Sequence, residues 1–155
     1  MDASVRWARQ DEWDEAMEMV WNTFLRFNSQ DCTPEGIQGF RDFITSEKLK
    51  EAFVEGSYQL MVALQGGRII GVGSLRGINH LSLLFVDGDH HLQGVGRMLL
   101  ERLCDYLKNE VGEYRISLTA SPVAVGFYKK LGFMQVRPKV NPTGIPVVYM
   151  EKVFM

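Results

Sequence analysis

Residues 80–100 read HLSLLFVDGDHHLQGVGRMLL: an almost continuous apolar run, a short polar connection, two glycines and a second apolar pattern. The run from 80 to 86 predicts a strand covered on both faces, because such strands are apolar without alternation. After Gly94 and Gly96, apolar side chains recur at every third or fourth position to about Asn109, which predicts an amphipathic helix. The stretch therefore predicts a strand, a glycine-containing turn and a helix.

The two glycines are compatible with more than one role. Glycines at a helix start let a ligand approach unpaired backbone amides, and the helix dipole favours an anion there. The dinucleotide motif, however, needs a third glycine where Leu99 stands. The phosphate loop of nucleotide hydrolases needs Lys and then Ser or Thr where Arg97 and Met98 stand. An anion site of another kind and an ordinary turn both remain open at this point.

The flanking sequence predicts the rest of the fold. Before the quoted stretch we expect a strand at 5–9, helices at 13–25, 33–44 and 47–55, and antiparallel strands at 58–64 and 68–75. After it we expect a strand at 115–120, a short helix at 122–131 and strands at 133–136 and 147–154. This order predicts a single α+β domain over residues 1–155, with a mixed central sheet of about six to seven strands flanked by helices.

Composition narrows the classes of partner. The 155 residues are 46% apolar with a net charge of −2, so no cationic field favours nucleic acid or an anionic membrane. No apolar run approaches ~20 residues and the N-terminus lacks a secretory pattern, so we expect a cytoplasmic protein without membrane contact. Cys32 and Cys104 are too few for a disulfide framework or a four-ligand zinc site, and no metal is expected.

The charge is divided unevenly along the chain. Residues 1–57 carry 12 acidic and 6 basic side chains, whereas residues 58–155 carry 7 acidic and 11 basic ones. The second part suits an anionic ligand and the first a cationic one. Acidic helix faces are also common where they are simply exposed to water, so this reading stays open.

A second motif gives the glycines a specific interpretation. Residues 121–133 read SPVAVGFYKKLGF, in which Tyr128 lies on the short helix that Pro122 opens and Gly132 closes. Together with HHLQGVGRMLL at 90–100, this motif resembles the GNAT superfamily of N-acetyltransferases, which transfer an acyl group from coenzyme A. The order of the expected elements is similar to that family along the whole chain. The resemblance implies a GNAT-like sheet and acetyl-CoA as the cosubstrate.

The resemblance also implies which residues bind acetyl-CoA. Backbone amides of the first motif are implied to hold the pyrophosphate, and the end of the preceding strand to pair with the pantetheine arm like an added strand. The implied binding residues are Leu84, Phe85, Val86, His91, Leu92, Gln93, Gly94, Val95, Gly96, Arg97, Ser121 and Tyr128. Two of them depart from the family pattern, because His91 stands where Arg or Gln is usual and Ser121 where Asn is common.

Two residues are candidates for proton transfer. By resemblance, Tyr128 donates a proton to the departing thiolate; its reference pKa of about 10 lies near the ~8.5 of a thiol. The alternative is a packed aromatic ring with its hydroxyl satisfied locally. His80, at the start of the central strand, is the candidate base that deprotonates the amine, with a structural, hydrogen-bonded histidine as the alternative.

We therefore expect an N-acetyltransferase that uses direct transfer, because neither cysteine falls in the two motifs. The alternative is a catalytically inactive coenzyme A-binding or protein-interaction module with the same fold. The acceptor is a small-molecule or peptide amine, in a pocket walled by the first two helices, where Trp21, Phe24, Phe27 and Phe40 are available. Family members are often dimers, so a homodimer is a further expectation to test.

Overall fold

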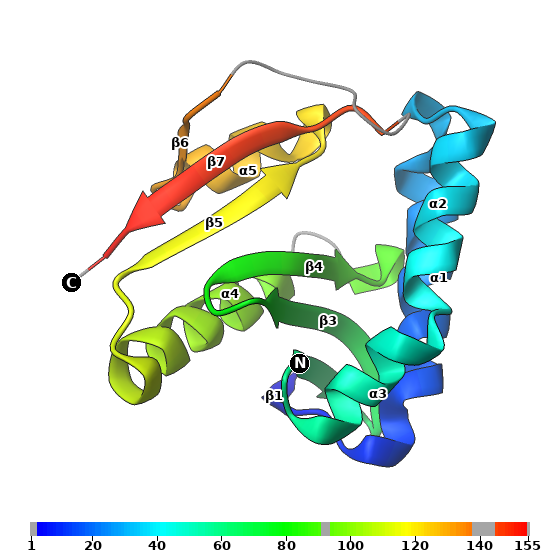
Figure 1. Ribbon diagram of the computed structural model, residues 1–155, viewed down its shortest axis with the longest axis horizontal. Helices are drawn as coiled ribbons and strands as arrows, with labels where there is room; N and C mark the ends of the chain where they lie inside the picture. The colour runs from blue at the N-terminus through cyan, green and yellow to red at the C-terminus, as the bar shows by residue number, and fades with distance from the viewer. Residues whose placement is uncertain (1–2, 91–93, 138–144, 155) are drawn as a thin grey trace.

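The computed structural model describes residues 3–90, 94–137 and 145–154. Within these ranges the strands form one mixed sheet in the order β1-β2-β3-β4-β5-β7-β6 (Figure 1). Every neighbouring pair is antiparallel except β4 and β5, which are parallel. The strands are β1 (Ser4–Trp7), β2 (Gln59–Gln65), β3 (Arg68–Arg76), β4 (His80–Val86), β5 (Arg115–Ala120), β6 (Met134–Gln135) and β7 (Val148–Val153). The expected α+β class and mixed sheet are confirmed.

Helices pack on both faces of the sheet. They are α1 (Trp13–Phe27), α2 (Pro34–Ile44), α3 (Glu47–Glu55), α4 (Val95–Tyr106) and α5 (Val125–Lys130). Short 3-10 turns cover Gln10–Glu12, Ser29–Asp31, Gly88–His90 and Pro122–Ala124, and a π-helical turn, Leu107–Val111, extends α4. No helix in the described ranges is both long and apolar enough to cross a membrane.

Local chemistry explains where several of these elements begin and end. Thr33 caps α2, because its side-chain oxygen accepts the Gly36 N–H at 3.0 Å. Ser46 caps α3 in the same way, through the Leu49 N–H at 3.3 Å. The tight hairpin turn between β2 and β3 contains Gly66 and Gly67, with φ of 59° and 77°. Residues that carry a β-carbon rarely adopt positive φ, so glycine is favoured at both positions.

Two apolar clusters lie on opposite faces of the sheet. One joins the sheet to α1 and α3 and includes Trp13, Val20, Phe53 and Leu83. The other joins it to α4 and α5 and includes Leu99, Leu103 and Tyr128. We call these the α1 cluster and the α4 cluster. They fix which face of the sheet each strand residue presents.

The sheet divides in its middle. Strands β4 and β5 pair only at His80–Ser117 and Leu81–Leu118, after which the two strands separate (Figure 1). We call this point the vertex. The prediction that residues 80–86 are covered on both faces is confirmed, because Leu84 and Val86 pack against the α4 cluster and Phe85 packs against the α1 cluster. Leu81 and Leu83 are buried, but Leu84, Phe85 and Val86 are only half-buried, because β5 does not accompany them.

Candidate active site

The first turn of α4 presents backbone amides that have no partner within the helix, beside the point where β4 and β5 separate. Gly94 precedes the helix with a φ of +79°, which glycine adopts without steric cost. The first backbone bond of the helix runs from the Met98 N–H to the Gly94 carbonyl at 3.0 Å. The amides of Val95, Gly96 and Arg97 come before this bond and have no partner within the helix. This turn is suited to an anion.

Gly96 lies where three elements meet. A β-carbon at this position would be 3.5 Å from Phe127 Cζ of α5 and 3.6 Å from Val86 Cγ2 of β4. Larger side chains would fill the space beside the amides. The end of β4, with Leu84, Phe85 and Val86 that were predicted to bind acetyl-CoA, therefore lies next to the start of α4. His91, Leu92 and Gln93 lie outside the described residues.

Arg97 and Ser121 are two further residues with polar side chains that the resemblance implies for acetyl-CoA binding. Arg97 is exposed, and its Nε donates to Glu101 Oε1 at 2.8 Å. The positive charge of Arg97 is therefore paired with a carboxylate one turn further along α4. Ser121 precedes the 3-10 turn, and its backbone carbonyl accepts the Ala124 N–H at 3.0 Å. Its side chain makes no capping bond.

The first part of the connection from β4 to α4, residues 87–90, is held by side chains of β2 and β3. Asp87 Oδ2 accepts from Arg68 Nη2 at 2.7 Å, and His90 Nε2 lies 2.7 Å from Gln65 Oε1. A β-carbon on Gly88 would be 2.7 Å from the Phe27 ring, so α1 packs closely against this connection. Asp87 therefore stabilises the start of this connection through its bond with Arg68.

Tyr128 has a buried ring, and none of the described residues is found to hydrogen-bond its hydroxyl. The ring packs edge-on against Phe127 and Phe133, with centroids 5.1 and 5.5 Å away. Burial alone raises the pKa of Tyr128, so the hydroxyl stays protonated at neutral pH. The packing expected of a structural tyrosine is present, but the hydroxyl remains available as a donor.

A polar row crosses the sheet at the vertex. Strand register places Arg76 beside His80, His80 beside Ser117, and Ser117 beside Glu151. Their chain neighbours belong to the α4 cluster, so these four side chains leave the sheet on the face of the α1 cluster. Of these four residues only His80 could be predicted from the sequence, because the row exists only through pairing between distant strands.

His80 has the environment of a neutral base. Its Nδ1 lies 2.9 Å from Ser117 Oγ. Burial lowers the pKa of His80, and the charge of Arg76 lowers it further. The ring is therefore uncharged at neutral pH. In the tautomer that donates Nδ1–H to Ser117, the Nε2 lone pair is available to accept a proton.

A second polar group at the vertex was missed from sequence. Tyr58 Oη lies 2.7 Å from Ser74 Oγ of β3 and donates to Ser82 Oγ of β4 at 3.0 Å. Both serines interrupt apolar strand sequences, GVGSL and HLSLL, which was the available signal. A serine inside an apolar strand indicates a buried hydroxyl that needs a partner.

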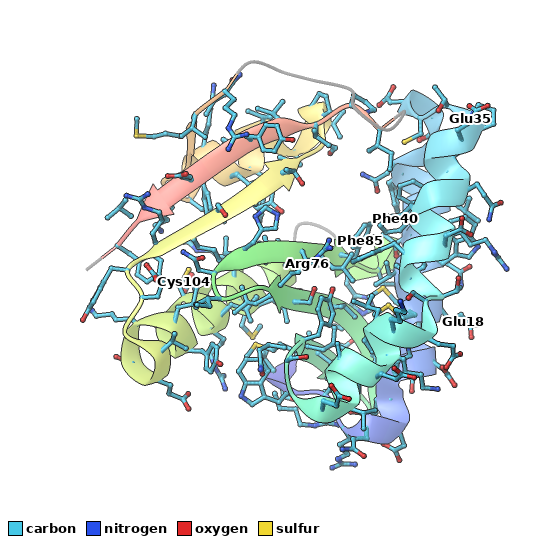
Figure 2. The ribbon with its side chains drawn as sticks, in the orientation of Figure 1. Glu18, Glu35, Phe40, Arg76, Phe85 and Cys104 are labelled. Atoms are coloured by element: carbon cyan, nitrogen blue, oxygen red, sulfur yellow. The ribbon has the colours of Figure 1, made fainter. Side chains whose placement is uncertain are left out.

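Aromatic side chains of α1 and α2 approach β4 on the same face. Phe24 stacks on Phe40 with ring centroids 4.2 Å apart. Phe40 in turn lies 5.8 Å from Phe85, and the two rings point toward one another between α2 and β4 (Figure 2). Trp21 stacks on Phe24, whereas Phe27 packs on the β4–α4 connection. Four aromatic side chains were predicted to be available for the wall of the acceptor pocket. Of these, Phe40 is the one on α2 that packs near β4, the strand predicted to bind the pantetheine arm.

Neither cysteine has the lowered pKa that is typical of a reactive thiol. Burial raises the pKa of Cys104 to about 11, and burial also raises the pKa of Cys32. Cys104 lies on α4, well away from Phe40 and Phe85 (Figure 2). Among the described residues no three His, Cys, Asp or Glu side chains gather as a metal site would require.

Comparison with known proteins identifies similar sequences and folds. Residues 28–154 match the family described as the acetyltransferase (GNAT) domain. A glucosamine 6-phosphate N-acetyltransferase of Trypanosoma brucei brucei is 32% identical over 77 residues, 43% of this chain and 52% of that protein. The peptidyl-lysine N-acetyltransferase YjaB of Salmonella typhimurium strain LT2 is 35% identical over 79 residues, 48% of this chain and 50% of that protein. The chain thus spans about half the length of the curated relatives it matches.

A solved structure shares the fold over nearly the full chain. The PaiA N-acetyltransferase from Thermoplasma acidophilum, determined in complex with coenzyme A, aligns with a TM-score of 0.84 at 19% identity. The alignment covers 99% of this chain and 100% of that one. At this level of identity the likeness concerns the fold alone.

Proposed function

The chain belongs to the GNAT family of acetyltransferases, and on that premise we propose that it transfers an acetyl group directly from acetyl-CoA to an amine. The observation that carries this proposal is the separation of β4 from β5 beside the first-turn amides of Val95 and Gly96, which have no partner within the helix. The backbone of Leu84 and Phe85 pairs with β3 on one side, and no β5 residue pairs with it on the other. An extended ligand with an anionic end fits such an edge.

The chain's own residues suit acetyl-CoA binding. The amides at the start of α4 would hold the pyrophosphate, and the β4 edge from Leu84 to Val86 would hold the pantetheine arm. Because Gly96 has no side chain, the backbone can approach the ligand closely. When bound, acetyl-CoA supplies an activated acyl carbon.

His80 is the proposed general base. An amine is protonated at neutral pH and must lose a proton before or during attack. His80 stands on the face of the α1 cluster, from which an acceptor would approach, and its lowered pKa keeps the ring neutral. Ser117 holds the ring by the bond to Nδ1. This geometry supports Nε2 as the atom that takes the proton.

Tyr128 is the proposed general acid. It lies on α5 next to Phe127, which contacts the helix start at Gly96. Because burial raises its pKa, Tyr128 keeps its proton at neutral pH. The same shift weakens Tyr128 as an acid relative to a thiol, whose pKa is ~8.5, so the hydroxyl acts on the departing thiolate first as a hydrogen-bond donor. Direct transfer is favoured over an acyl-cysteine route, because the raised pKa of Cys104 keeps that thiol protonated.

The relatives support an amine as the acceptor. Their names give an amino sugar phosphate in one case and a peptidyl lysine in the other, both of them primary amines. We extend this chemistry to the present chain as a proposal, with a small-molecule or peptide amine as substrate. The Phe40–Phe85 pair adds an apolar wall that favours an acceptor with some hydrophobic surface.

The test is an acceptor screen with acetyl-CoA, read by release of free thiol. The panel contains a lysine peptide, glucosamine 6-phosphate and phenethylamine. Amine-dependent thiol release supports the proposal. Thermal stabilisation by acetyl-CoA without release for any primary amine favours the inactive binding module. If no coenzyme A ester stabilises the protein, both functions are wrong.

A further inference from the structure

Ser82 lies at a β-bulge between β3 and β4. Leu81 pairs with Leu75 of β3, and Leu83 pairs with Ser74, so Ser82 is an extra residue in the ladder between β3 and β4. It is also the first β4 residue after the pairing with β5 has ended. Such a bulge re-aims a side chain and is common beside active sites. Here it lies directly at the vertex.

The bulge turns Ser82 toward the α1 cluster, where Tyr58 holds it. Tyr58 is 3% exposed and Ser74 is fully buried, whereas Ser82 is half-buried. Tyr58 has one hydroxyl proton and donates it to Ser82, so Ser74 must donate to Tyr58. The three hydroxyl groups thus form a directed chain that ends at Ser82. Within the described residues Tyr58 is the only side chain found to hydrogen-bond Ser82.

The direction of this chain defines what Ser82 can offer. Its oxygen uses one lone pair for Tyr58 and keeps a second, together with its own proton. An attacking amine must direct its nitrogen lone pair at the acyl carbon, so a productive hydrogen bond to the amine has the N–H as donor. The remaining lone pair of Ser82 is an acceptor for that N–H. His80, two residues earlier, lies on the same face of the sheet.

We infer that Ser82 binds the reacting nitrogen of the acceptor amine and that Tyr58 is the positioning residue that orients Ser82. The inference rests on the proposed function, because it assigns a role within the same site. Ser82 and His80 would then contact different N–H groups of one amine, so the site should prefer primary amines to secondary ones. Burial raises the pKa of Tyr58, so its hydroxyl remains a donor throughout the working range.

The experiment compares Ser82→Ala with Ser82→Thr, which keeps the hydroxyl, and with Ser57→Ala as an exposed control next to Tyr58. For the panel amine that the wild-type protein acetylates fastest, Ser82→Ala is expected to lower kcat/KM about ten-fold. Binding of that amine to protein saturated with coenzyme A, measured by calorimetry, should weaken to a similar extent. Affinity for coenzyme A itself should not change, and Ser82→Thr should restore most of the loss.

A double-mutant cycle separates positioning from simple stability. Tyr58→Phe is expected to lower kcat/KM in the wild-type background but to have little further effect when Ser82 is already Ala. Equal losses in both backgrounds would show that Tyr58 does not act through Ser82. Unchanged amine binding in Ser82→Ala would overturn the inference while leaving acetyl transfer intact. If no panel amine is acetylated, the proposed function fails first, and this role fails with it.

Discussion

The Nδ1 atom of His80 lies 2.9 Å from the Oγ atom of Ser117, on two parallel strands that separate one residue later. The bond joins the two halves of the sheet by side chains at the point where backbone pairing ends. It also fixes the ring that we propose as the base. The vertex is therefore at once a structural junction and the centre of the candidate site.

Replacing His80 by Gln should lower kcat with the best acceptor by about 10²-fold or more, because general base catalysis contributes typically 10² to 10⁴. Gln can still bond to Ser117 but does not accept a proton at neutral pH. Steady-state thiol release measures the effect. Ser117→Ala is the companion variant and should lose less, because the base remains. Full activity in His80→Gln would remove His80 from the mechanism.

Arg76→Gln should change the pH dependence of the reaction. The pKa of His80 is lowered first by burial and second by Arg76, so removing that positive charge raises it. The base is active when unprotonated, and its activity is lost as the pH falls through this pKa. The acid limb of kcat/KM is therefore expected below pH ~6.5 in the wild type and at higher pH in Arg76→Gln. Arg41→Gln, on α2, should leave the limb in place.

Tyr128→Phe should reduce turnover by about 10²-fold while acetyl-CoA affinity changes little. The ring still packs against Phe127 and Phe133, so the melting temperature should stay close to that of the wild type. Tyr114→Phe, at a tyrosine that is 47% exposed, is the control. Unchanged thiol release in the Tyr128 variant would assign that residue a packing role only.

Gly96→Val should weaken coenzyme A binding by about ten-fold, equivalent to ~1.4 kcal/mol. Its β-carbon would just contact Phe127 and Val86, and the two additional methyl groups would displace these residues or cover the amides. Calorimetric titration with coenzyme A measures the change. At Gly126 a β-carbon meets no atom within 4 Å, so Gly126→Ala should bind like the wild type. Equal affinity for Gly96→Val would place the pyrophosphate elsewhere.

Glu12→Gln should flatten the stability profile in acid. A side-chain hydrogen bond from Arg6 is the largest cause that lowers the pKa of Glu12 to about 2, against about 4.3 for a free glutamate. The stabilisation is complete above the unfolded value and is lost as the pH falls from there toward 2. Melting curves of wild type and Glu12→Gln should therefore converge over this window. Asp11→Asn is the control, and parallel curves would argue against the pair.

The sequence predicted the order of the elements well, because each carries a local signal. Thr33 and Pro34 start α2, and residues 47–55 form α3 as expected. Local signals weaken where a strand is short, so the strand expected at 133–136 is reduced to Met134–Gln135. The helix expected to end near Asn109 continues as a π-helical turn to Val111, whose wider bonding has no clear sequence signature.

The candidate site was predictable only in part. The glycine-containing start of α4 could be predicted from Gly94 and Gly96, because the apolar pattern of the helix begins directly beside them. The partner of His80 could not be found, since Ser117 reaches it through strand register rather than through chain spacing. The bulge at Ser82 likewise depends on how β3 and β4 align.

The separation of β4 and β5 also affects how the protein holds together. With only two residue pairs across the vertex, cohesion between the halves depends mainly on the α4 cluster, which has members from β3, β5 and β7. Side-chain packing lets strands shift slightly without rupture, whereas a hydrogen-bonded ladder fixes them in register. A thermal fluctuation that separates β4 from β5 thus breaks few backbone hydrogen bonds. Amide hydrogens of β5 should therefore exchange with solvent sooner than those of β3. A ligand seated in the opening would act as a removable eighth strand, and its occupancy would slow that exchange.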